Sequence, residues 1–160
     1  MQLGSVYLVC RDFARTIEFY TMLLEEPPCA RNRDRFAQFC KGGQALCVMN
    51  GDYDAQHPGE TVFVGPRDAV YDDLPGIARA ENGRKAVLNF WTEDLMAEYA
   101  RVKPLLPPEA RLTPIRYLCS ASPYYYFSLL DPDGNIVEVT GNCTDEAMRK
   151  TWKVDEEGCV

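Results

Sequence analysis

The sequence predicts an α+β fold made of two tandem βαβββ modules. Three observations lead to this prediction. A strand, a capping aspartate and an amphipathic helix occur twice, 82 residues apart. Each helix is followed by short segments with β-strand patterning, and glycine or proline turns separate those segments. The length of 160 residues accommodates two such modules and excludes two large independent domains.

The first copy begins at segment 6–10, whose β-branched and apolar residues predict a strand. Asp12 then fits a helix N-cap, and the apolar residues that follow it have the spacing of one helix face. We therefore expect these residues to pack against the sheet: Phe13, Ile17, Tyr20 and Leu24.

The second copy repeats this pattern in register. Segment 86–91 predicts a strand and Asp94 an N-cap. The apolar helix positions, each offset by 82 from the first copy, are Leu95, Tyr99, Val102 and Leu106. A repeated cap and helix face, each preceded by a strand, indicates an internal duplication.

Prolines end both predicted helices, and β patterning follows. In the first module a short segment at 29–31 precedes two strands, 36–40 and 45–49, which Gly42-Gly43 joins as a hairpin. In the second module the predicted strands are 112–118, 124–130 and 135–140. Asp131-Pro132-Asp133-Gly134 predicts the turn between the last two, because proline presets φ and glycine accepts a positive φ.

These elements divide the chain into four parts: a first module at 1–50, a connector at 51–84, a second module at 85–141 and a tail at 142–160. The connector carries most of the acidity, and within it we expect a short strand at 61–64 and local structure at 72–80. The tail predicts a short helix over 144–153, with acidic residues first and basic residues last, as the helix dipole favours.

Composition excludes several classes of protein. The seven cysteines are odd in number and show no Cys-x-x-Cys spacing, so we interpret them as reduced, apolar side chains of a cytoplasmic protein. A net charge of −7 argues against a nucleic-acid partner. No apolar run is long enough to cross a membrane, and the first residues show no export signal, so we expect no membrane association.

Three segments together resemble the glyoxalase/bleomycin resistance/extradiol dioxygenase superfamily, also called the vicinal oxygen chelate proteins. They are 12–20, 93–99 and, most specifically, the Asp-Pro-Asp-Gly-Asn-Ile-Val-Glu segment at 131–138. The resemblance covers residues 3–50 and 85–141. It implies paired modules whose mixed, curved sheets enclose one cavity, and it also implies a homodimer.

In metal-dependent members of this superfamily, four inward side chains bind a divalent ion. The resemblance places these positions at Ser5, Cys47, Val87 and Glu138. A hydroxyl, a thiol, an alkyl group and one carboxylate make a poor donor set, because a borderline divalent ion needs about three imidazole or carboxylate ligands. His57 is the single histidine and lies in the connector, away from these positions. We therefore expect no metal and no cofactor.

Strand alternation selects the residues expected to line the cavity. Ser5 shares a strand face with Tyr7, and Val87 shares one with Asn89 and Trp91. The aromatic run 124–127 offers Tyr124 and Tyr126 as further candidates, although the sequence leaves open which face of this run lines the cavity. The predicted ligand-binding residues are Ser5, Tyr7, Cys47, Val87, Asn89, Trp91, Tyr124 and Tyr126.

Three functions fit these features. The first is a metal-free protein, similar to bleomycin-resistance proteins, that sequesters an aromatic or cationic small molecule and so confers antibiotic resistance. The second is a lyase, isomerase or dioxygenase of this superfamily with an altered site, in which Glu138 transfers a proton as the catalytic base. The third is a non-catalytic interaction module whose acidic connector binds a partner. Whether the chain is an enzyme is left open by the sequence.

Overall fold

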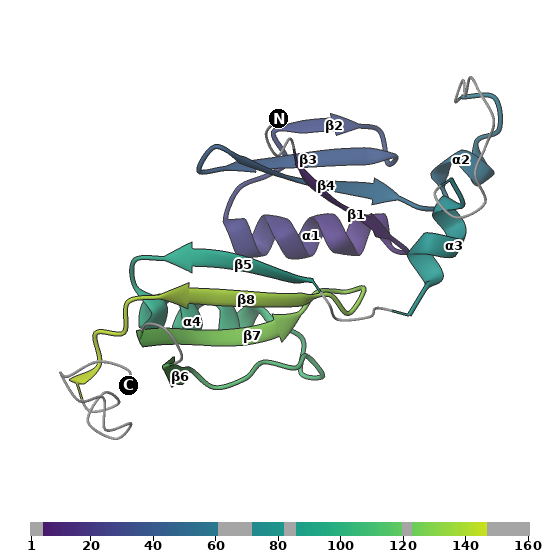
Figure 1. Cartoon of the computed structure of the whole chain (residues 1–160). Coiled ribbons are helices and arrows are strands. Elements are labelled where there is room, and N and C mark those ends of the chain that lie inside the picture. The colour runs from purple at the N-terminus through teal and green to yellow at the C-terminus, as the bar shows by residue number, and fades with distance from the viewer. Residues whose placement is uncertain (1–4, 61–71, 82–85, 120–122, 147–160) are drawn as a thin grey trace. The chain divides into compact units, whose positions relative to one another are not determined.

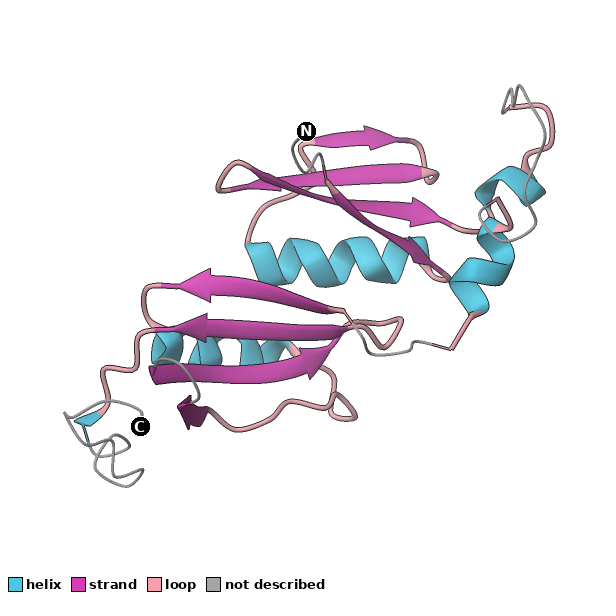
Figure 2. Cartoon of the chain, viewed as in Figure 1, coloured by secondary structure: helices cyan, strands magenta, loops and turns pink. Residues whose placement is uncertain are grey.

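The computed structural model describes residues 5–60, 72–81, 86–119 and 123–146 (Figure 1). The chain divides into two compact units, Met1–Asn82 and Gly83–Val160. In both, a curved, open sheet of four strands carries an α-helix on one face, as Figure 2 shows, and this confirms the predicted α+β class.

Unit 1 contains β1 (Val6–Cys10), α1 (Phe13–Leu24), β2 (Ala30–Asn32), β3 (Phe36–Lys41) and β4 (Gln44–Asn50). The strand order is β1-β4-β3-β2, with β1 parallel to β4 and the other neighbours antiparallel. A helical crossover between parallel β1 and β4, followed by hairpins, gives the predicted βαβββ module.

Unit 2 contains β5 (Val87–Thr92), α4 (Leu95–Val102), β6 (Arg116–Cys119), β7 (Pro123–Leu130) and β8 (Ile136–Gly141). Its strand order, β5-β8-β7-β6, has the topology of unit 1. Tyr7 lies beside Cys47 in unit 1, and the residue 82 positions later, Asn89, lies beside Glu138 in unit 2. The predicted duplication is therefore confirmed at the level of strand register.

Both predicted N-caps form. The Asp12 side chain accepts a hydrogen bond of 3.0 Å from the backbone N–H of Arg15, and the Asp94 side chain accepts one of 2.9 Å from that of Ala97. Each aspartate satisfies one of the backbone donors that the first helical turn leaves without a partner. The two strand-to-helix connections are thus built in the same way.

The buried face of α1 is the predicted one, since Phe13, Ile17, Tyr20 and Leu24 are all buried. In α4, Leu95 and Val102 are buried, while Tyr99 is half-buried and packs edge-on against Phe127 at 5.2 Å between ring centroids. Leu106 was predicted as a core residue of this helix. That prediction is wrong because α4 ends at Val102 and a 3₁₀ turn at Lys103–Leu105, containing Pro104, follows it, leaving Leu106 half-buried outside the helix.

The predicted strand at 112–118 is shorter in the structure and begins at Arg116. Pro114 interrupts the segment, and the preceding Thr113 contacts β7 through two separate bonds. Its backbone N–H donates to the Ser128 carbonyl at 2.9 Å, and its hydroxyl accepts from the Ser128 N–H at 2.9 Å. A side-chain oxygen therefore replaces one backbone acceptor of a regular ladder.

The turn between β7 and β8 forms as predicted. Asp131 is buried, and one oxygen of its carboxylate accepts from the backbone N–H groups of Asp133 and Asn135 at 3.0 and 2.8 Å. Its other oxygen accepts from the Asn135 side chain at 2.8 Å, and Gly134 has a φ of 85°. The Asp131 side chain thus stabilises the turn by these hydrogen bonds, and Gly134 adopts the left-handed backbone conformation that the turn requires.

The predicted connector forms two short helices where the structure describes it, α2 (Tyr53–Gln56) and α3 (Leu74–Arg79). Helix α3 packs closely on the end of β4, since a Cβ built on Gly51 would lie 2.6 Å from the Cβ of Ala78. The predicted strand at 61–64 lies outside the described residues, as does most of the predicted tail helix at 144–153.

The interpretation of the cysteines needs correction. Cys29 and Cys40 form a disulfide with a Cα–Cα distance of 6.0 Å, whereas Cys10, Cys47 and Cys143 are buried thiols, as expected. Antiparallel pairing of β2 and β3 makes the bridge possible, since the Cys29 N–H donates to the Gln38 carbonyl at 2.8 Å. A disulfide weakens the cysteine-based argument for a cytoplasmic location. In the described part of the chain, none of the helices has the length and apolar character needed to cross a membrane.

Candidate ligand-binding faces

One face of the sheet in unit 2 carries α4, and the opposite face, here called the outer face of unit 2, carries the predicted site residues. Along β5 the exposed residues are Val87, Asn89 and Trp91, alternating with half-buried ones. The helix side of the neighbouring strands is apolar and buried; its residues are Phe127, Leu129, Val137 and Val139. Side chains alternate between the two faces along each strand, so one face forms the packed core and the other is a surface of mixed polarity.

Register places the side chains of the outer face in rows across the strands. Asn89 lies beside Glu138, which lies beside Ser128. A neighbouring row contains Trp91, Thr140, Tyr126 and Arg116. Residues in one row point to the same side of a sheet, so Glu138 and Tyr126 share the face of Asn89 and Trp91.

A chain of hydrogen bonds orients the carboxylate on this face. The Asn89 side-chain Nδ2 donates to Glu138 Oε1 at 3.0 Å. The buried Thr140 hydroxyl lies 3.5 Å from Asn89 Oδ1 and 3.3 Å from the Phe90 carbonyl, and its single O–H is shared between these two acceptors. Because Thr140 occupies the oxygen side of the amide, the NH₂ side is directed toward Glu138.

Aromatic groups lie in the row next to Glu138. Trp91 is 65% exposed, which is unusual for an indole, and Tyr126 is half-buried with the Arg116 guanidinium 6.0 Å from its ring centroid. Tyr125 points to the other face, where its ring packs against Tyr117 at 5.0 Å. Tyr124 pairs with Leu118 along β7, and its side chain is outside what the structure describes.

The corresponding surface of unit 1 is its outer face, on the sheet side that carries Tyr7. Tyr7 is 60% exposed and lies beside Cys47, which in turn lies beside Gln38. Cys47 occupies the place that Glu138 has in unit 2, but its thiol is buried. Ser5 is exposed and directly precedes β1.

Neither a family model nor a curated protein matches this chain. Its structure, however, is similar to several solved ones. A glyoxalase/bleomycin resistance protein/dioxygenase from Nocardioides matches with a TM-score of 0.60 and 19% identity, over 90% of this chain and 85% of that one. A lactoylglutathione lyase from Agrobacterium tumefaciens matches with a TM-score of 0.55 and 17% identity, over 88% and 93% of the two chains. A bleomycin-binding protein complexed with bleomycin matches with a TM-score of 0.52 and 18% identity, over 89% and 99%.

The chain has the glyoxalase/bleomycin resistance/dioxygenase fold. This confirms the fold that the resemblance of segment 131–138 implied. Both βαβββ modules of the fold are present, because these matches extend over most of each chain.

The metal-ligand positions that the resemblance assigns in this fold do not suit a divalent ion. Val87 has no donor atom, Cys47 presents a buried thiol, and Ser5 offers a neutral hydroxyl. Glu138 is the one carboxylate of the four, and it already accepts from Asn89. Among the described residues, no three His, Cys, Asp or Glu side chains are grouped so that they could hold a metal ion.

His57 does not join either outer face. Its ring stacks on Tyr53 with 4.1 Å between centroids, and its Nδ1 lies 2.9 Å from the Tyr53 carbonyl oxygen. Three further residues of the outer face of unit 2 were not predicted from the sequence: Ser128, Thr140 and Arg116. Thr140 could have been found by alternation from Glu138, whereas Ser128 and Arg116 depend on antiparallel register, which no local pattern specifies.

Proposed function

We propose that this chain binds a small aromatic or cationic organic molecule, without a metal ion, on the outer face of unit 2. The observation that supports this most is the combination of an exposed indole at Trp91 with a carboxylate at Glu138 whose position is held by Asn89. A solvated tryptophan beside an oriented charge suits a ligand that is flat and carries a positive group.

The aromatic groups would provide most of the affinity. Stacking of a planar or cationic ligand on Trp91 and Tyr126 contributes roughly 0.5–2 kcal/mol for each ring. Glu138 would select ligands with a basic group, since a charge-assisted hydrogen bond is stronger than a neutral one. On the outer face of unit 1, Ser5, Tyr7 and Cys47 are proposed as ligand contacts, and Tyr7 is exposed there.

The similar bleomycin-binding protein supports sequestration of a drug as the physiological role, and antibiotic resistance as its consequence. Bleomycin is therefore the first compound to test, followed by a panel of cationic and neutral aromatic molecules. A ligand that binds the native state alone raises the melting temperature by mass action, so a thermal-shift screen reports binding directly.

Two variants test the site with the ligand found by this screen. Trp91→Ala should abolish the thermal shift, whereas Leu105→Ala removes another exposed apolar side chain and should leave it unchanged. Glu138→Gln should weaken a cationic ligand at least about tenfold and change a neutral one little, because it removes a charge-assisted bond. Glu109→Gln is the control for loss of one exposed carboxylate. Unchanged binding by both site variants would contradict the proposal.

The hydrogen bond from Asn89 also favours a second candidate, in which Glu138 is the catalytic base of a lyase, isomerase or dioxygenase. Elemental analysis separates the metal-free binding protein from a metal-dependent form of this enzyme. About one metal ion per chain in the purified protein, lost in Glu138→Gln, would replace the metal-free proposal with a metal-dependent enzyme. Metal content that stays far below one per chain after nickel, manganese, iron or zinc is added supports the binding protein.

A further inference from the structure

A polar cavity of about 330 Å³ lies in unit 1, between the turn that joins β2 to β3 and the segment around α2. Its lining residues are Asn32, Arg33, Arg35, Tyr53 and Glu60. None of them belongs to the residues assigned above to ligand binding. Two guanidinium groups and one carboxylate around a single cavity make it a candidate for recognising a charged small molecule.

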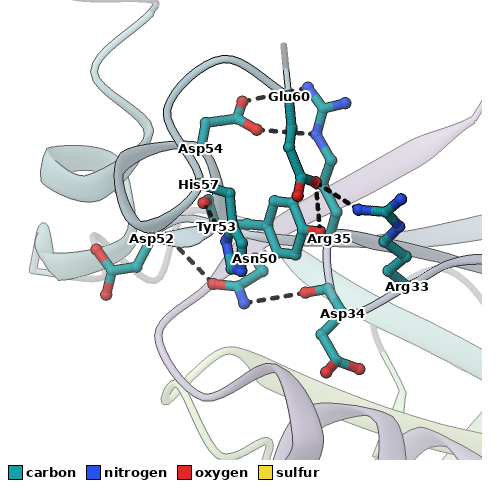
Figure 3. Close-up of polar contacts among 9 residues, drawn as sticks. All are labelled: Arg33, Asp34, Arg35, Asn50, Asp52, Tyr53, Asp54, His57 and Glu60. Carbon is teal, nitrogen blue, oxygen red and sulfur yellow. Dashed lines mark hydrogen bonds and ion pairs between the residues drawn. The ribbon is translucent and has the colours of Figure 1, made fainter.

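Contacts between the two segments hold the walls of this cavity. Arg35 and Asp54 form a two-pronged ion pair, with Nε 2.9 Å from Oδ1 and Nη2 3.2 Å from Oδ2. The Asn50 amide donates to the Asp34 carbonyl at 2.9 Å and accepts from the Asp52 N–H at 3.1 Å. The ion pair with Asp54 keeps the Arg35 guanidinium in one orientation, and Asn50 links the turn to the segment around α2 (Figure 3).

Two contacts also hold the carboxylate of Glu60 in place. Figure 3 shows Glu60 between the Tyr53 hydroxyl, which donates to Oε2 at 2.9 Å, and Arg33 Nη1, which lies 2.7 Å from the same oxygen. Tyr53 is buried, and His57 stacks on its ring. The bond from Tyr53, followed by the charge of Arg33, holds the pKa of Glu60 below its ordinary value. Glu60 is thus anionic at neutral pH, and both described contacts use one of its two oxygens.

The arginines keep donors for a ligand. Each guanidinium has five N–H groups. Arg33 uses them for the bond to Glu60 and an interaction with the Tyr53 hydroxyl, and Arg35 uses two for Asp54, so both retain N–H groups for a ligand. Arg33 also has a φ of 50°, in the turn closed by the bond from the Arg35 N–H to the Asn32 carbonyl. Glycine is the residue that takes this conformation without strain, and strained residues concentrate at binding sites.

We propose that this cavity binds a free α-amino acid. Its carboxylate is held by the remaining N–H groups of Arg33 and Arg35, and its ammonium group is held by Glu60 Oε1. A simple anion fits less well, because Glu60 repels it locally and the chain carries a net charge of −7. A zwitterion has no net charge and matches both signs of the lining.

The test is NMR titration of the full chain with three small probes: L-alanine, propionate and ethylamine. Propionate lacks the ammonium group and ethylamine lacks the carboxylate. L-alanine should give saturable shifts in the Arg33 and Arg35 side-chain N–H signals, and each of the other probes should bind at least about tenfold more weakly, having lost one charge-assisted contact. Propionate binding as tightly as L-alanine, or L-alanine shifts that never saturate, would overturn the proposal.

Variants locate the binding. Arg33→Gln and Glu60→Gln should each weaken L-alanine at least about tenfold. Arg111→Gln and Glu109→Gln, which neutralise exposed charges in unit 2, should leave it unchanged. Arg33→Lys keeps the charge without the planar fork and should fall between wild type and Arg33→Gln. Wild-type affinity in both cavity variants, with spectra showing a folded protein, would show that L-alanine binds elsewhere.

Discussion

Asn89 and Glu138 are 49 positions apart in the sequence and lie side by side on parallel strands β5 and β8, joined by a hydrogen bond of 3.0 Å. In unit 1 the same register brings Tyr7 beside Cys47. The two pairs occupy equivalent positions in the duplicated fold but differ in chemistry. The pair in unit 1 is a phenol and a thiol, and the pair in unit 2 is an amide and a carboxylate. This difference makes the outer face of unit 2 the more polar of the two candidates.

Replacing the amide by a second carboxylate should destabilise unit 2. In Asn89→Asp two like charges face each other across neighbouring strands, which costs up to about 1 kcal/mol. The loss should be present at pH 7 and shrink in acid, because protonation of either carboxyl group removes the repulsion. Denaturant unfolding at pH 7 and at an acidic pH measures this effect. Asn142→Asp, at an exposed position, is the control, and equal stability of the two variants at pH 7 would contradict the assigned contact.

Leu24 lies on the buried face of α1, with 8% of its surface exposed. Leu24→Ala should lower the free energy of unfolding by roughly 2–5 kcal/mol, since it removes buried methyl groups and leaves a cavity. Leu105→Ala removes the same atoms from a side chain that is 55% exposed, so we expect a change within about 0.5 kcal/mol. Thermal unfolding of Leu24→Ala within a degree or two of wild type would show that the helix face is wrongly assigned.

The disulfide between Cys29 and Cys40 should stabilise unit 1. It closes a short loop, with a sequence separation of 11, and on a chain-entropy estimate such a link contributes about 3 kcal/mol. Cys29→Ser and Cys40→Ser should each lose this stability, and a reducing agent should destabilise wild type but neither variant. Non-reducing peptide mapping should recover the two cysteines in one cross-linked peptide. Recovery of both as alkylated thiols would contradict the bridge.

Tyr53→Phe should raise the pKa of Glu60 toward the ordinary glutamate value, because it removes the hydrogen bond that contributes most to lowering it. A lowered carboxyl pKa stabilises the native state above the unfolded pKa, and this stability is lost as the pH falls through the folded pKa. The variant should therefore be less sensitive to acid than wild type. Carbon-detected NMR titration of the Glu60 carboxyl group measures the shift, with Tyr99→Phe as control. No change in the Glu60 midpoint would contradict the contact.

We expect a homodimer in solution. The resemblance to the glyoxalase/bleomycin resistance/extradiol dioxygenase superfamily implies this assembly, and two-fold dimers are the most frequent soluble assembly. Light scattering at micromolar concentrations should return twice the chain mass of 18.1 kDa. A mass of about one chain across that range would refute the dimer.

Much of the architecture follows from local chemistry, and the sequence alone was sufficient for it. The caps at Asp12 and Asp94, the buried face of α1 and the turn around Gly134 depend on residues within a few positions of one another. Short-range hydrogen bonds and helical periodicity specify such features directly. Because the same strand, cap and helix recur 82 residues later, the sequence also predicted that the second module has the same order of elements as the first.

Contacts between distant segments were decided by the tertiary structure. Alternation assigns a residue to a face of its strand but does not name its neighbour on the next strand, because that neighbour depends on register. For this reason the sequence placed Glu138 at a candidate site but did not pair it with Asn89, and it missed the disulfide between Cys29 and Cys40. The cavity around Arg33 and Glu60 was likewise not predicted, since a turn and a loop 27 positions apart meet there only after β2, β3 and β4 have paired.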